Sequence, residues 1–460
     1  MSDNFDAIVI GAGQAGPPLA DKLTRAGMRV AVIERHLVGG TCVNTGCMPT
    51  KTLVASAYAA HMARRANDFG VVIDGAVRVD FERVQARAHQ VTMNARNNLQ
   101  EWLRNMSGCE LIEGHARFES PTSVRVGERM LNASKIFINV GARASRPPLD
   151  GVDSVPTLNN TSMLELRELP DHLVVIGGSY IGLEFAQMYR RFGARVTVVE
   201  KSSHLISRED VEVSEAIEQF LAEEGIEIRT HAECIRLAAH KDGIAVNVNC
   251  ESGEPEVVGS HVLLAVGRTP NTHDLGLDRA GVKCDERGYI EVDDALATNV
   301  PGIWAMGDCN GKGAFTHTAY NDHEIIAANV LEGANRRVSD RVLAYALYTD
   351  PPLGRVGMTL MQARAMKRRL LVGTRPMTRV GRAIEKAETH GLMQIIVDAQ
   401  SHKILGAAIL GPGGDEAIHG VIDVMNAEAA YPLLQWSVPV HPTVSELIPT
   451  LLNELQPVGE

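Results

Sequence analysis

Residues 39–51 read GGTCVNTGCMPTK and place Cys42 and Cys47 five positions apart. On an ideal α-helix this spacing gives a rise of about 7.5 Å, which exceeds the roughly 4.4–6.8 Å between the Cα atoms of a disulfide. Asn44 and Gly46 would allow the distorted helix start that a bridge needs. A bridge that closes so short a loop adds little stability, so the pattern favours a reducible, catalytic pair. Two free thiols, or half of a metal site without a second pair of ligands, are the alternatives.

A glycine-rich turn precedes the two cysteines. Residues 6–35 read DAIVIGAGQAGPPLADKLTRAGMRVAVIER, the pattern of a strand, a tight turn, a helix and a second strand. In GAGQAG, Gly11 makes the turn, Gly13 lets the backbone approach a pyrophosphate, and Gly16 permits close helix packing. Glu34 lies 23 positions after Gly11 and can accept hydrogen bonds from an adenosine ribose. The unit predicts a dinucleotide site.

The same unit occurs a second time. The segment that begins at Val174 matches the first unit at 11 of 28 positions without a gap. Gly177 and Gly182 repeat the first and last glycines of the turn, and Glu200 repeats the terminal acidic residue at the same spacing. Ser179 replaces the middle glycine, which slightly crowds a pyrophosphate. The chain is therefore predicted to have two dinucleotide sites.

A third segment, IWAMGD, reads as a short strand that ends on Gly307 and Asp308, where an aspartate can hold a ribityl hydroxyl. Two dinucleotide sites beside a pair of cysteines suggest a route for electrons. We predict that electrons pass from a nicotinamide through a flavin to sulfur.

The composition excludes several other functions. A chain of 460 residues is long enough for roughly three domains, and a net charge of -11 disfavours binding to nucleic acid or to anionic lipid. The N-terminus has no basic region or cleavage site of a signal peptide, and no apolar run approaches the roughly 18 residues of a membrane span. We expect a cytoplasmic enzyme of small-molecule chemistry. The isolated cysteines are predicted to be small buried side chains: Cys109, Cys234, Cys250, Cys284 and Cys309.

Together, these motifs resemble those of the pyridine nucleotide-disulfide oxidoreductases, the flavoprotein family of dihydrolipoamide dehydrogenase, glutathione reductase and mercuric reductase. GGTCVNTGCMPTK resembles the family's redox-disulfide motif, and GAGQAG and AMGDC resemble its two FAD motifs. GGSYIGLE resembles its nicotinamide site, AVGRTPN a central motif, and HPTVSE its C-terminal acid/base motif. The six motifs follow the family's order over nearly the whole chain.

The resemblance implies an α/β fold with two Rossmann-like dinucleotide-binding domains and a C-terminal α+β dimerisation domain. Residues 1–150 would form the FAD-binding domain with the redox disulfide, and residues 151–268 the NAD(P)-binding domain. Residues 269–340 would be a central segment that completes the FAD site. Residues 341–460 would be the dimerisation domain.

The resemblance also implies different tasks for the two sulfurs. Cys47 would lie next to the flavin as the charge-transfer thiol, and Cys42 would exchange with the sulfur of the substrate. Lys51 and Glu184 would form an ion pair near the reactive flavin nitrogen. Tyr180 would gate the nicotinamide pocket. The same motifs imply further cofactor-binding positions at Thr41, Lys51, Gly141 and Gly267.

A histidine near the C-terminus is implied as the acid/base group. His441 lies five residues before Glu446 in HPTVSE, and the family uses this pair as a dyad that reaches the disulfide of the partner subunit. Imidazole, with an unperturbed pKa of about 6.5, suits proton transfer to a leaving thiolate, and a carboxylate orients the ring. The resemblance therefore implies a homodimer with active sites shared across the interface. The other histidines, including His317, are expected to be structural or flavin-backbone positions.

The sequence leaves the substrate open. Mercuric reductases carry a vicinal cysteine pair near the C-terminus, whereas the last cysteine here is Cys309. Glu200 followed by Lys201, in place of the arginines of the glutathione-reductase branch, favours NAD(H) over NADP(H). We expect an FAD-dependent oxidoreductase for a small-molecule or protein-bound disulfide, or a dithiol, most like dihydrolipoamide dehydrogenase or mercuric reductase-like enzymes. A metal-ion or quinone reductase of the same family and a redox-sensing flavoprotein with little turnover are the alternatives, and no resident metal is expected.

Overall fold

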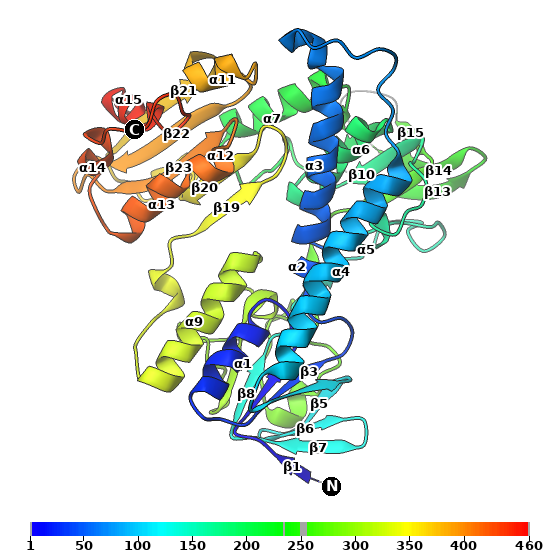
Figure 1. The fold of residues 1–460 in the computed structure, drawn as a ribbon, viewed down its shortest axis with the longest axis vertical. Coiled ribbons are helices and arrows are strands. Elements are labelled where there is room, and N and C mark those ends of the chain that lie inside the picture. Colours follow the sequence, from blue (N-terminus) through cyan, green and yellow to red (C-terminus); the bar gives the residue numbers. More distant parts are fainter. Residues whose placement is uncertain (1, 233–234, 249–254, 459–460) are drawn as a thin grey trace.

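The computed structural model describes residues 2–232, 235–248 and 255–458, and Figure 1 shows three sheet-containing units arranged around two long helices. The first unit, at the bottom of the view, is built on a parallel sheet in the order β18-β8-β2-β3-β4. Its strands are β2 (Ala7–Ile10), β3 (Val30–Glu34), β4 (Cys109–Glu113), β8 (Lys135–Ile138) and β18 (Ile303–Ala305). Strand β2 is buried along its whole length, as an all-apolar parallel strand should be.

Both faces of this sheet are covered. Ala7 and Val9 pack on one face with helices α1 (Gly16–Arg25) and α9 (Thr316–Glu332), whereas Ile8 packs on the other with a second sheet. That sheet has the order β1-β7-β6-β5. Its strands are β1 (Ser2–Asn4), β5 (Ala116–Ser120), β6 (Ser123–Val126) and β7 (Arg129–Asn132). The alternation along β2 follows from the two-residue period of a strand.

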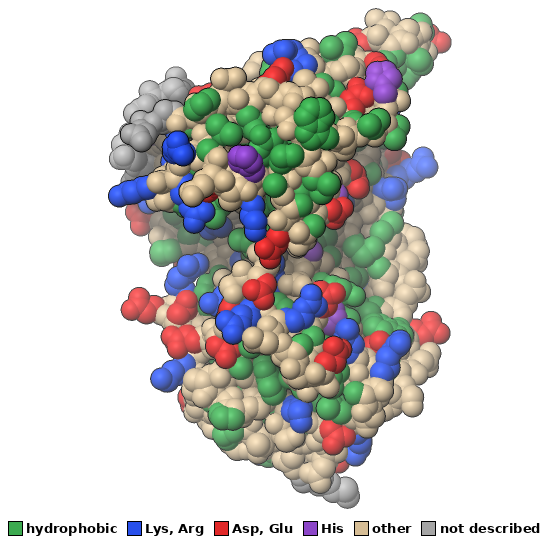
Figure 2. Space-filling view, turned by 90° about the vertical axis from the view of Figure 1, so that its left-hand side faces the viewer, with side chains coloured by type: hydrophobic (Ala, Val, Ile, Leu, Met, Phe, Trp, Pro, Cys, Tyr) green, Lys and Arg blue, Asp and Glu red, His purple; other side chains and the backbone are tan. Residues whose placement is uncertain are grey.

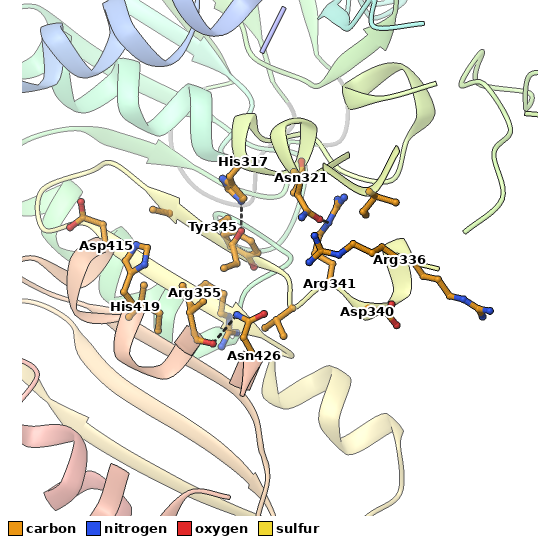
Figure 3. A pocket seen from close by; sticks show the side chains of 18 of the residues that line it. His317, Asn321, Arg336, Asp340, Arg341, Tyr345, Arg355, Asp415, His419 and Asn426 are labelled. Atoms are coloured by element: carbon orange, nitrogen blue, oxygen red, sulfur yellow. Dashed lines mark hydrogen bonds between the residues drawn. The ribbon is translucent and has the colours of Figure 1, made fainter. Parts of the chain in front are cut away.

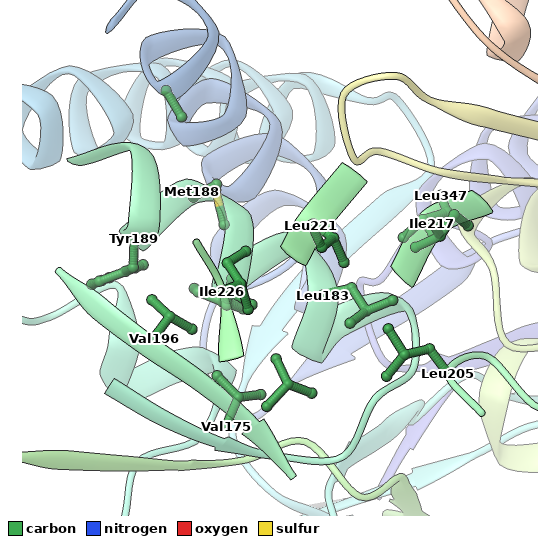
Figure 4. Packing of buried hydrophobic residues seen from close by; sticks show 14 of the residues in the cluster. Val175, Leu183, Met188, Tyr189, Val196, Leu205, Ile217, Leu221, Ile226 and Leu347 are labelled. Carbon is green, nitrogen blue, oxygen red and sulfur yellow. The ribbon is translucent and has the colours of Figure 1, made fainter. Parts of the chain in front are cut away.

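The second unit repeats the parallel arrangement in the order β12-β11-β10-β16. Its strands are β10 (His172–Ile176), β11 (Arg195–Val199), β12 (Glu227–Arg229) and β16 (His261–Leu264). Figure 4 shows Leu183, Met188 and Tyr189 packing with Val175 and Val196 of the sheet. The helices of this unit are α5 (Asn160–Met163), α6 (Tyr180–Phe192) and α7 (Val211–Glu223). An antiparallel sheet covers the other face, with strands β13 (Arg236–His240), β14 (Gly243–Asn247) and β15 (Glu256–Gly259).

The third unit is an antiparallel sheet with helices packed against it. The strand order is β19-β20-β23-β22-β21-β24. The strands are β19 (Ala344–Leu347), β20 (Leu353–Gly357), β21 (Leu370–Pro376), β22 (Leu392–Asp398), β23 (Ile404–Leu410) and β24 (Gln456–Pro457). The helices are α10 (Leu360–Ala365), α11 (Gly381–Glu385), α12 (Gly414–Ala417), α13 (His419–Asn426), α14 (Pro432–Gln435) and α15 (Leu447–Asn453). The predicted α/β class, with two Rossmann-like units and a C-terminal α+β unit, is confirmed.

Helices and a strand pair connect these units. Helix α3 (Cys47–Arg64) packs against both α4 (Phe81–Asn105) and α6, so it joins the first unit to the second. Strands β9 (Ala142–Ala144) and β17 (Arg268–Pro270) pair where the chain leaves the first unit and returns to it. The remaining helices are α2 (Gly40–Asn44) and α8 (Leu277–Ala280). None of the helices in the described ranges has the length and apolarity needed to cross a bilayer.

The expected burial of the isolated cysteines holds only in part. Cys309 is fully buried and Cys109 is half-buried, but Cys284 is exposed, so the prediction was wrong there. Cys284 lies in the polar surface segment KCDERG, where its neighbours leave no apolar surface to cover it. Cys234 and Cys250 lie outside the described residues.

The helix-packing glycines are required by close backbone contacts. A Cβ atom on Gly16 would lie 2.3 Å from the carbonyl oxygen of Gly11, and one on Gly182 would lie 2.0 Å from that of Gly177. Neither position has room for a side chain.

We predict that Gly182→Ala destabilises the protein by about 1–3 kcal/mol, because helix α6 must move away from the turn. The melting temperature of Gly182→Ala should be compared with that of a control variant that also gains one methyl group. Gly381→Ala is the matched control, since its new Cβ would meet nothing within 4 Å. Equal melting temperatures for the two variants would show that the close contact does not limit stability.

Candidate active site

The helix is broken between the two cysteines. Cys42 lies in α2, and Cys47 is the first residue of α3. Between the helices, Gly46 adopts φ -134° and ψ -118°, outside the helical region, and a Cβ there would lie 2.9 Å from the carbonyl oxygen of Thr41. The structure holds both cysteines as half-buried free thiols, and the Cys47 sulfur lies 3.2 Å from the Thr316 hydroxyl. The distorted helix start that the spacing required is therefore present.

The pKa values of the two thiols are shifted in opposite directions. The hydrogen bond from Cys42, the Thr316 hydroxyl 3.2 Å away and the charge of Lys51 lower the pKa of Cys47 to about 6, against the opposing effect of burial. The same hydrogen bond, followed by burial, raises the pKa of Cys42 far above that of an ordinary thiol. At neutral pH the proton therefore stays on Cys42 and the negative charge on Cys47.

Lys51 and Glu184 form the ion pair that the sequence implied. The Lys51 Nζ lies 2.9 and 2.7 Å from the two carboxylate oxygens of Glu184, which is nearly buried. Tyr348 holds both partners, because its backbone N–H donates to Glu184 at 3.0 Å and its ring centroid lies 4.5 Å from the Lys51 nitrogen. Tyr348 was not identified from the sequence, since nothing local in its segment marks it as a neighbour of α3.

The two glycine turns are built alike. Glu34 accepts hydrogen bonds from the backbone N–H of Ala12, at 2.9 Å, and from the N–H two residues beyond itself. Glu200 accepts from the N–H of Gly178, at 2.6 Å, and again from the N–H two residues beyond. Each acidic residue is thus held by hydrogen bonds beside the glycine turn of its own unit.

Both turns fit a dinucleotide. Helix α6 begins without a side-chain cap, so the N–H groups of its first turn are available to a pyrophosphate. Helix α1 offers fewer donors, because Pro17 and Pro18 have no N–H and the N–H groups of Gly16 and Leu19 donate to backbone carbonyls. A Cβ on Gly13 would meet nothing nearer than 3.5 Å, which leaves the first turn open to a close approach. The segment that leads into the cysteines is attached to the first turn, because the N–H of Gly39 donates to the carbonyl oxygen of Ala12 at 2.8 Å.

The predicted ribityl-binding residue, Asp308, is half-buried beside an arginine. Asp308 lies 3.2 Å from the Nε of Arg268, and burial raises the pKa of the Asp308 carboxyl. Arg268 also reaches the Thr41 hydroxyl at 3.5 Å. Gly141 and Gly267, at either side of this region, have positive φ angles of 64° and 122°. Gly307 donates its N–H to the buried Asp322 at 2.8 Å. Arg268 was missed although it follows Gly267 in the AVGRTPN motif.

Tyr180 lies at the start of α6, where its hydroxyl donates to the buried Glu209 at 3.0 Å. A cavity of about 450 Å³ opens nearby, between α9 and α13. Figure 3 shows His317 and Tyr345 in its wall, and the Nε2 of His317 lies 2.6 Å from the carbonyl oxygen of Ala344. His317 thus has a structural bond, as expected.

Within the described residues, no cluster of three or more His, Cys, Asp or Glu side chains could hold a metal ion.

His441 and Glu446 form a pair that lies away from the cysteines of the same chain. The His441 Nδ1 lies 2.9 Å from a Glu446 oxygen, and the His441 side chain is 82% exposed. Figure 1 places α15, which follows Glu446, at the outer end of the third unit and well apart from α2. The structure therefore does not bring this pair to Cys42 and Cys47 within one chain.

Exposed apolar side chains surround the His441 pair. Trp436 is 80% exposed and Val438 is 96% exposed, and Leu433 and Val440 are also open. Figure 2 shows hydrophobic side chains gathered over the upper part of the face that points to the left in Figure 1. Exposed apolar surface of this kind is typical of a protein interface.

Comparisons with known proteins agree on one family. The family model described as pyridine nucleotide-disulphide oxidoreductase matches residues 5–322, and the model of its dimerisation domain matches residues 343–452. A relative named "Probable pyridine nucleotide-disulfide oxidoreductase RclA", from Escherichia coli (strain K12), is 36% identical over 459 residues, which cover 98% of this chain and 99% of the relative. A dihydrolipoyl dehydrogenase from Bacillus subtilis (strain 168) is 31% identical over 447 residues, 96% of each chain.

A mercuric reductase from Streptomyces lividans is 33% identical over 419 residues, which cover 90% of this chain and 88% of the relative. Among solved structures, the HOCl-induced flavoprotein disulfide reductase RclA from Escherichia coli superposes with a TM-score of 0.88 at 36% identity. That match covers 97% of this chain and 99% of the other. Its Cu(II) complex gives a TM-score of 0.89 at 35% identity, with 98% and 99% covered.

The proton distribution between the sulfurs gives a pH prediction. Because the pKa of Cys47 is lowered, its thiolate should form above pH about 6. The alkylation rate of Cys47 by iodoacetamide, followed by peptide mass spectrometry on the reduced protein, should rise with a midpoint near that pH. Cys42→Ala should move the midpoint up toward the roughly 8.5 of a free thiol, because the hydrogen-bond donor is lost. Cys42→Ser, which keeps a hydroxyl donor, should lie between the two. An unchanged midpoint in Cys42→Ala would rule out this hydrogen bond as the cause.

Proposed function

Because the chain belongs to the pyridine nucleotide-disulphide oxidoreductase family and is an FAD-dependent oxidoreductase, we propose that it uses NADH to reduce a disulfide substrate through Cys42 and Cys47. The observation that carries this proposal is the thiol pair across the break at Gly46, with its charge on Cys47. A small-molecule or protein-bound disulfide is the proposed substrate. A redox-sensing module with little turnover is disfavoured, because the chain combines the cysteine pair with two glycine turns and the His441–Glu446 pair.

The residues of the two glycine turns would hold the cofactors. FAD, when bound, supplies the acceptor for a hydride from the nicotinamide and the donor of an electron pair to sulfur. The proposed FAD-binding residues are Gly11, Gly13, Gly16, Glu34, Thr41, Lys51, Gly141, Gly267, Gly307 and Asp308. The proposed nicotinamide-site residues are Gly177, Tyr180, Gly182 and Glu200. We place the Lys51–Glu184 pair beside the flavin, where it would fix a positive charge near Cys47.

The thiols then reduce the substrate in two exchange steps. The Cys42 sulfur attacks one sulfur of the substrate disulfide, which forms a mixed disulfide and releases the first thiol. The Cys47 thiolate attacks the sulfur of Cys42, which closes the Cys42–Cys47 disulfide and releases the second sulfur of the substrate as a thiolate. The raised pKa of Cys42 means that this thiol needs a base before it can attack. The partner subunit's His441, oriented by the partner's Glu446, is proposed to take that proton and to return it to the leaving thiolate.

This role of His441 requires two chains. The match to the dimerisation domain supports a homodimer. The exposed His441 and the exposed apolar side chains around it, including Trp436 and Val438, are the surface that we propose the dimer covers. Each active site would then combine the cysteines of one chain with the histidine of the other.

A thiophilic metal ion is the second candidate substrate. One similar structure is named as a Cu(II) complex of RclA, and a thiolate with a pKa of about 6 beside a second thiol is a soft ligand pair. Mercury as substrate is less supported, because the chain has no vicinal cysteine pair near its C-terminus. Turnover assays with lipoamide, small disulfides, quinones and Cu(II) would separate these substrates.

Mixed dimers test the shared site. We expect Cys47→Ser and His441→Ala homodimers to bind FAD, with disulfide turnover abolished in the first and reduced by roughly 100- to 10,000-fold in the second. A heterodimer with one subunit of each variant should recover about half of the wild-type turnover. One of its sites then has both the intact cysteines and the intact histidine. A heterodimer as inactive as its parents would place each site within a single chain.

Glu200 is the basis for a nicotinamide preference. Its carboxylate would accept hydrogen bonds from the adenosine ribose and repel the 2'-phosphate of NADPH. Lys201 and Arg208 are exposed and could compensate, so kcat/KM should be compared for both nucleotides in the wild type and in Glu200→Ala. We expect NADH to be preferred and Glu200→Ala to gain activity with NADPH. A wild-type preference for NADPH would contradict the proposal.

A further inference from the structure

Three side chains converge on the buried carboxylate of Glu209. The hydroxyls of Tyr180 and Tyr345 donate to the same oxygen, Oε1, at 3.0 and 2.7 Å. The Nε of Arg355 lies 3.1 Å from the other oxygen, and the side chains of Glu209 and Arg355 are both completely buried. A carboxylate removed from water in this way depends on these partners for its stability.

The cluster joins the second unit to the third. Tyr180 is the first residue of α6, and Glu209 lies in the loop before α7. Tyr345 is on β19 and Arg355 is on β20, which belong to the third unit. Arg355 also donates to Asp210 at 2.6 Å. The position of Tyr180 is therefore coupled to the sheet of the third unit.

The Tyr180 ring lies edge-on against two other rings that stack on each other. Phe315 and Tyr345 stack with a centroid distance of 5.5 Å and an interplanar angle of 8°. Tyr180 meets both rings edge-on, at 6.2 and 5.6 Å. Figure 3 shows Tyr345 on the wall of the cavity beside His317, on which the Phe315 ring also stacks. Movement of Tyr180 would leave this stack intact.

We infer that Glu209 is a positioning residue that holds Tyr180 in its closed position and so sets how readily the nicotinamide reaches the flavin. The inference rests on the proposed role of Tyr180 as the gate of the nicotinamide pocket. In the closed state, the Tyr180 hydroxyl is held by a buried charge rather than by water. The gate opens when this hydrogen bond breaks.

Tyr345 lowers the cost of opening. When Tyr180 moves away, the buried carboxylate of Glu209 still has two partners, the Tyr345 hydroxyl and the Arg355 guanidinium. Without the Tyr345 hydroxyl, Glu209 would lose its last hydroxyl donor on opening. The two tyrosines should therefore have opposite effects on nucleotide binding.

Stopped-flow reduction of the FAD-containing dimer by NADH, without oxygen and over a range of NADH concentrations, tests this inference. Tyr180→Phe keeps the ring and removes the hydroxyl, so the apparent Kd for NADH should fall by about tenfold, the usual effect of one hydrogen bond to a charged group. Tyr345→Phe keeps the stacked ring and should raise the Kd severalfold. In Tyr345→Phe the limiting rate of flavin reduction should stay near the wild-type value, because Tyr345 is not one of the proposed nicotinamide-site residues.

The double variant separates positioning from packing. If Tyr345 acts only through the shared carboxylate, Tyr345→Phe should have no effect on the Kd in the Tyr180→Phe background. An equal rise in both backgrounds would mean that Tyr345 acts by packing, and would overturn the inference. Glu209→Gln, a weaker acceptor, should lower the Kd as Tyr180→Phe does. The two phenylalanine variants decide the question even if Glu209→Gln does not fold.

A third substitution distinguishes this inference from the gate itself. Tyr180→Ala removes the whole ring and should lower the Kd at least as much as Tyr180→Phe. An effect of Tyr180→Ala without an effect of Tyr180→Phe would keep the gate and overturn the role of Glu209. If neither variant changes NADH binding, Tyr180 is not a gate, and both proposals fail together.

Discussion

The ion pair between Lys51 and Glu184 aligns the two nucleotide-binding units. Lys51 is four residues after Cys47, the first residue of α3, and Glu184 is four residues after Tyr180, the first residue of α6. Residues at this spacing share a helix face, so a contact of 2.7 Å between the charged groups also sets the relative positions of the two helix starts. Because Glu184 is nearly buried, removal of one partner would cost about 3–5 kcal/mol. Cys47 and Tyr180, at the starts of α3 and α6, are therefore positioned by the same contact.

The asymmetry of the two thiols follows from where the chain bends. Gly46 interrupts the helix, so the Cys42 thiol can turn toward Cys47 and donate a hydrogen bond to it. Thr316 and Lys51 favour the negative charge on Cys47, whereas burial and the hydrogen bond keep the proton on Cys42. Two residues of the same type thus differ in charge at neutral pH. This difference in charge gives the two sulfurs different reactivity toward a disulfide.

The third unit contributes to the site from two directions. Within the chain, Tyr348 contacts Lys51 and Glu184, and Tyr345 shares Glu209 with Tyr180. Toward solvent, the same unit presents the His441 pair on an exposed apolar surface. The third unit therefore contacts both the Lys51–Glu184 pair and the start of α6. Association of two chains would act on the chemistry as well as on stability.

The sequence by itself determined the parts of the protein that are encoded locally. Short sequence patterns predicted the α/β class, both glycine turns and the Cys42–Cys47 pair, because the spacing within each pattern determines the local geometry. The pairing of His441 with Glu446 came from the family resemblance, and the observed contact is 2.9 Å. The Lys51–Glu184 pair came from the family resemblance, since 133 positions separate the two residues and no local pattern links them.

Only the tertiary structure decided which distant side chains complete the site. Thr316 is 269 positions from Cys47 and Tyr345 is 136 positions from Glu209, and each of these contacts depends on how separate units pack. The charge on Cys47 could not be predicted either, because a pKa depends on burial and neighbouring groups in space. Local spacing specifies turns and helix starts, whereas contacts between units exist only once the chain has folded.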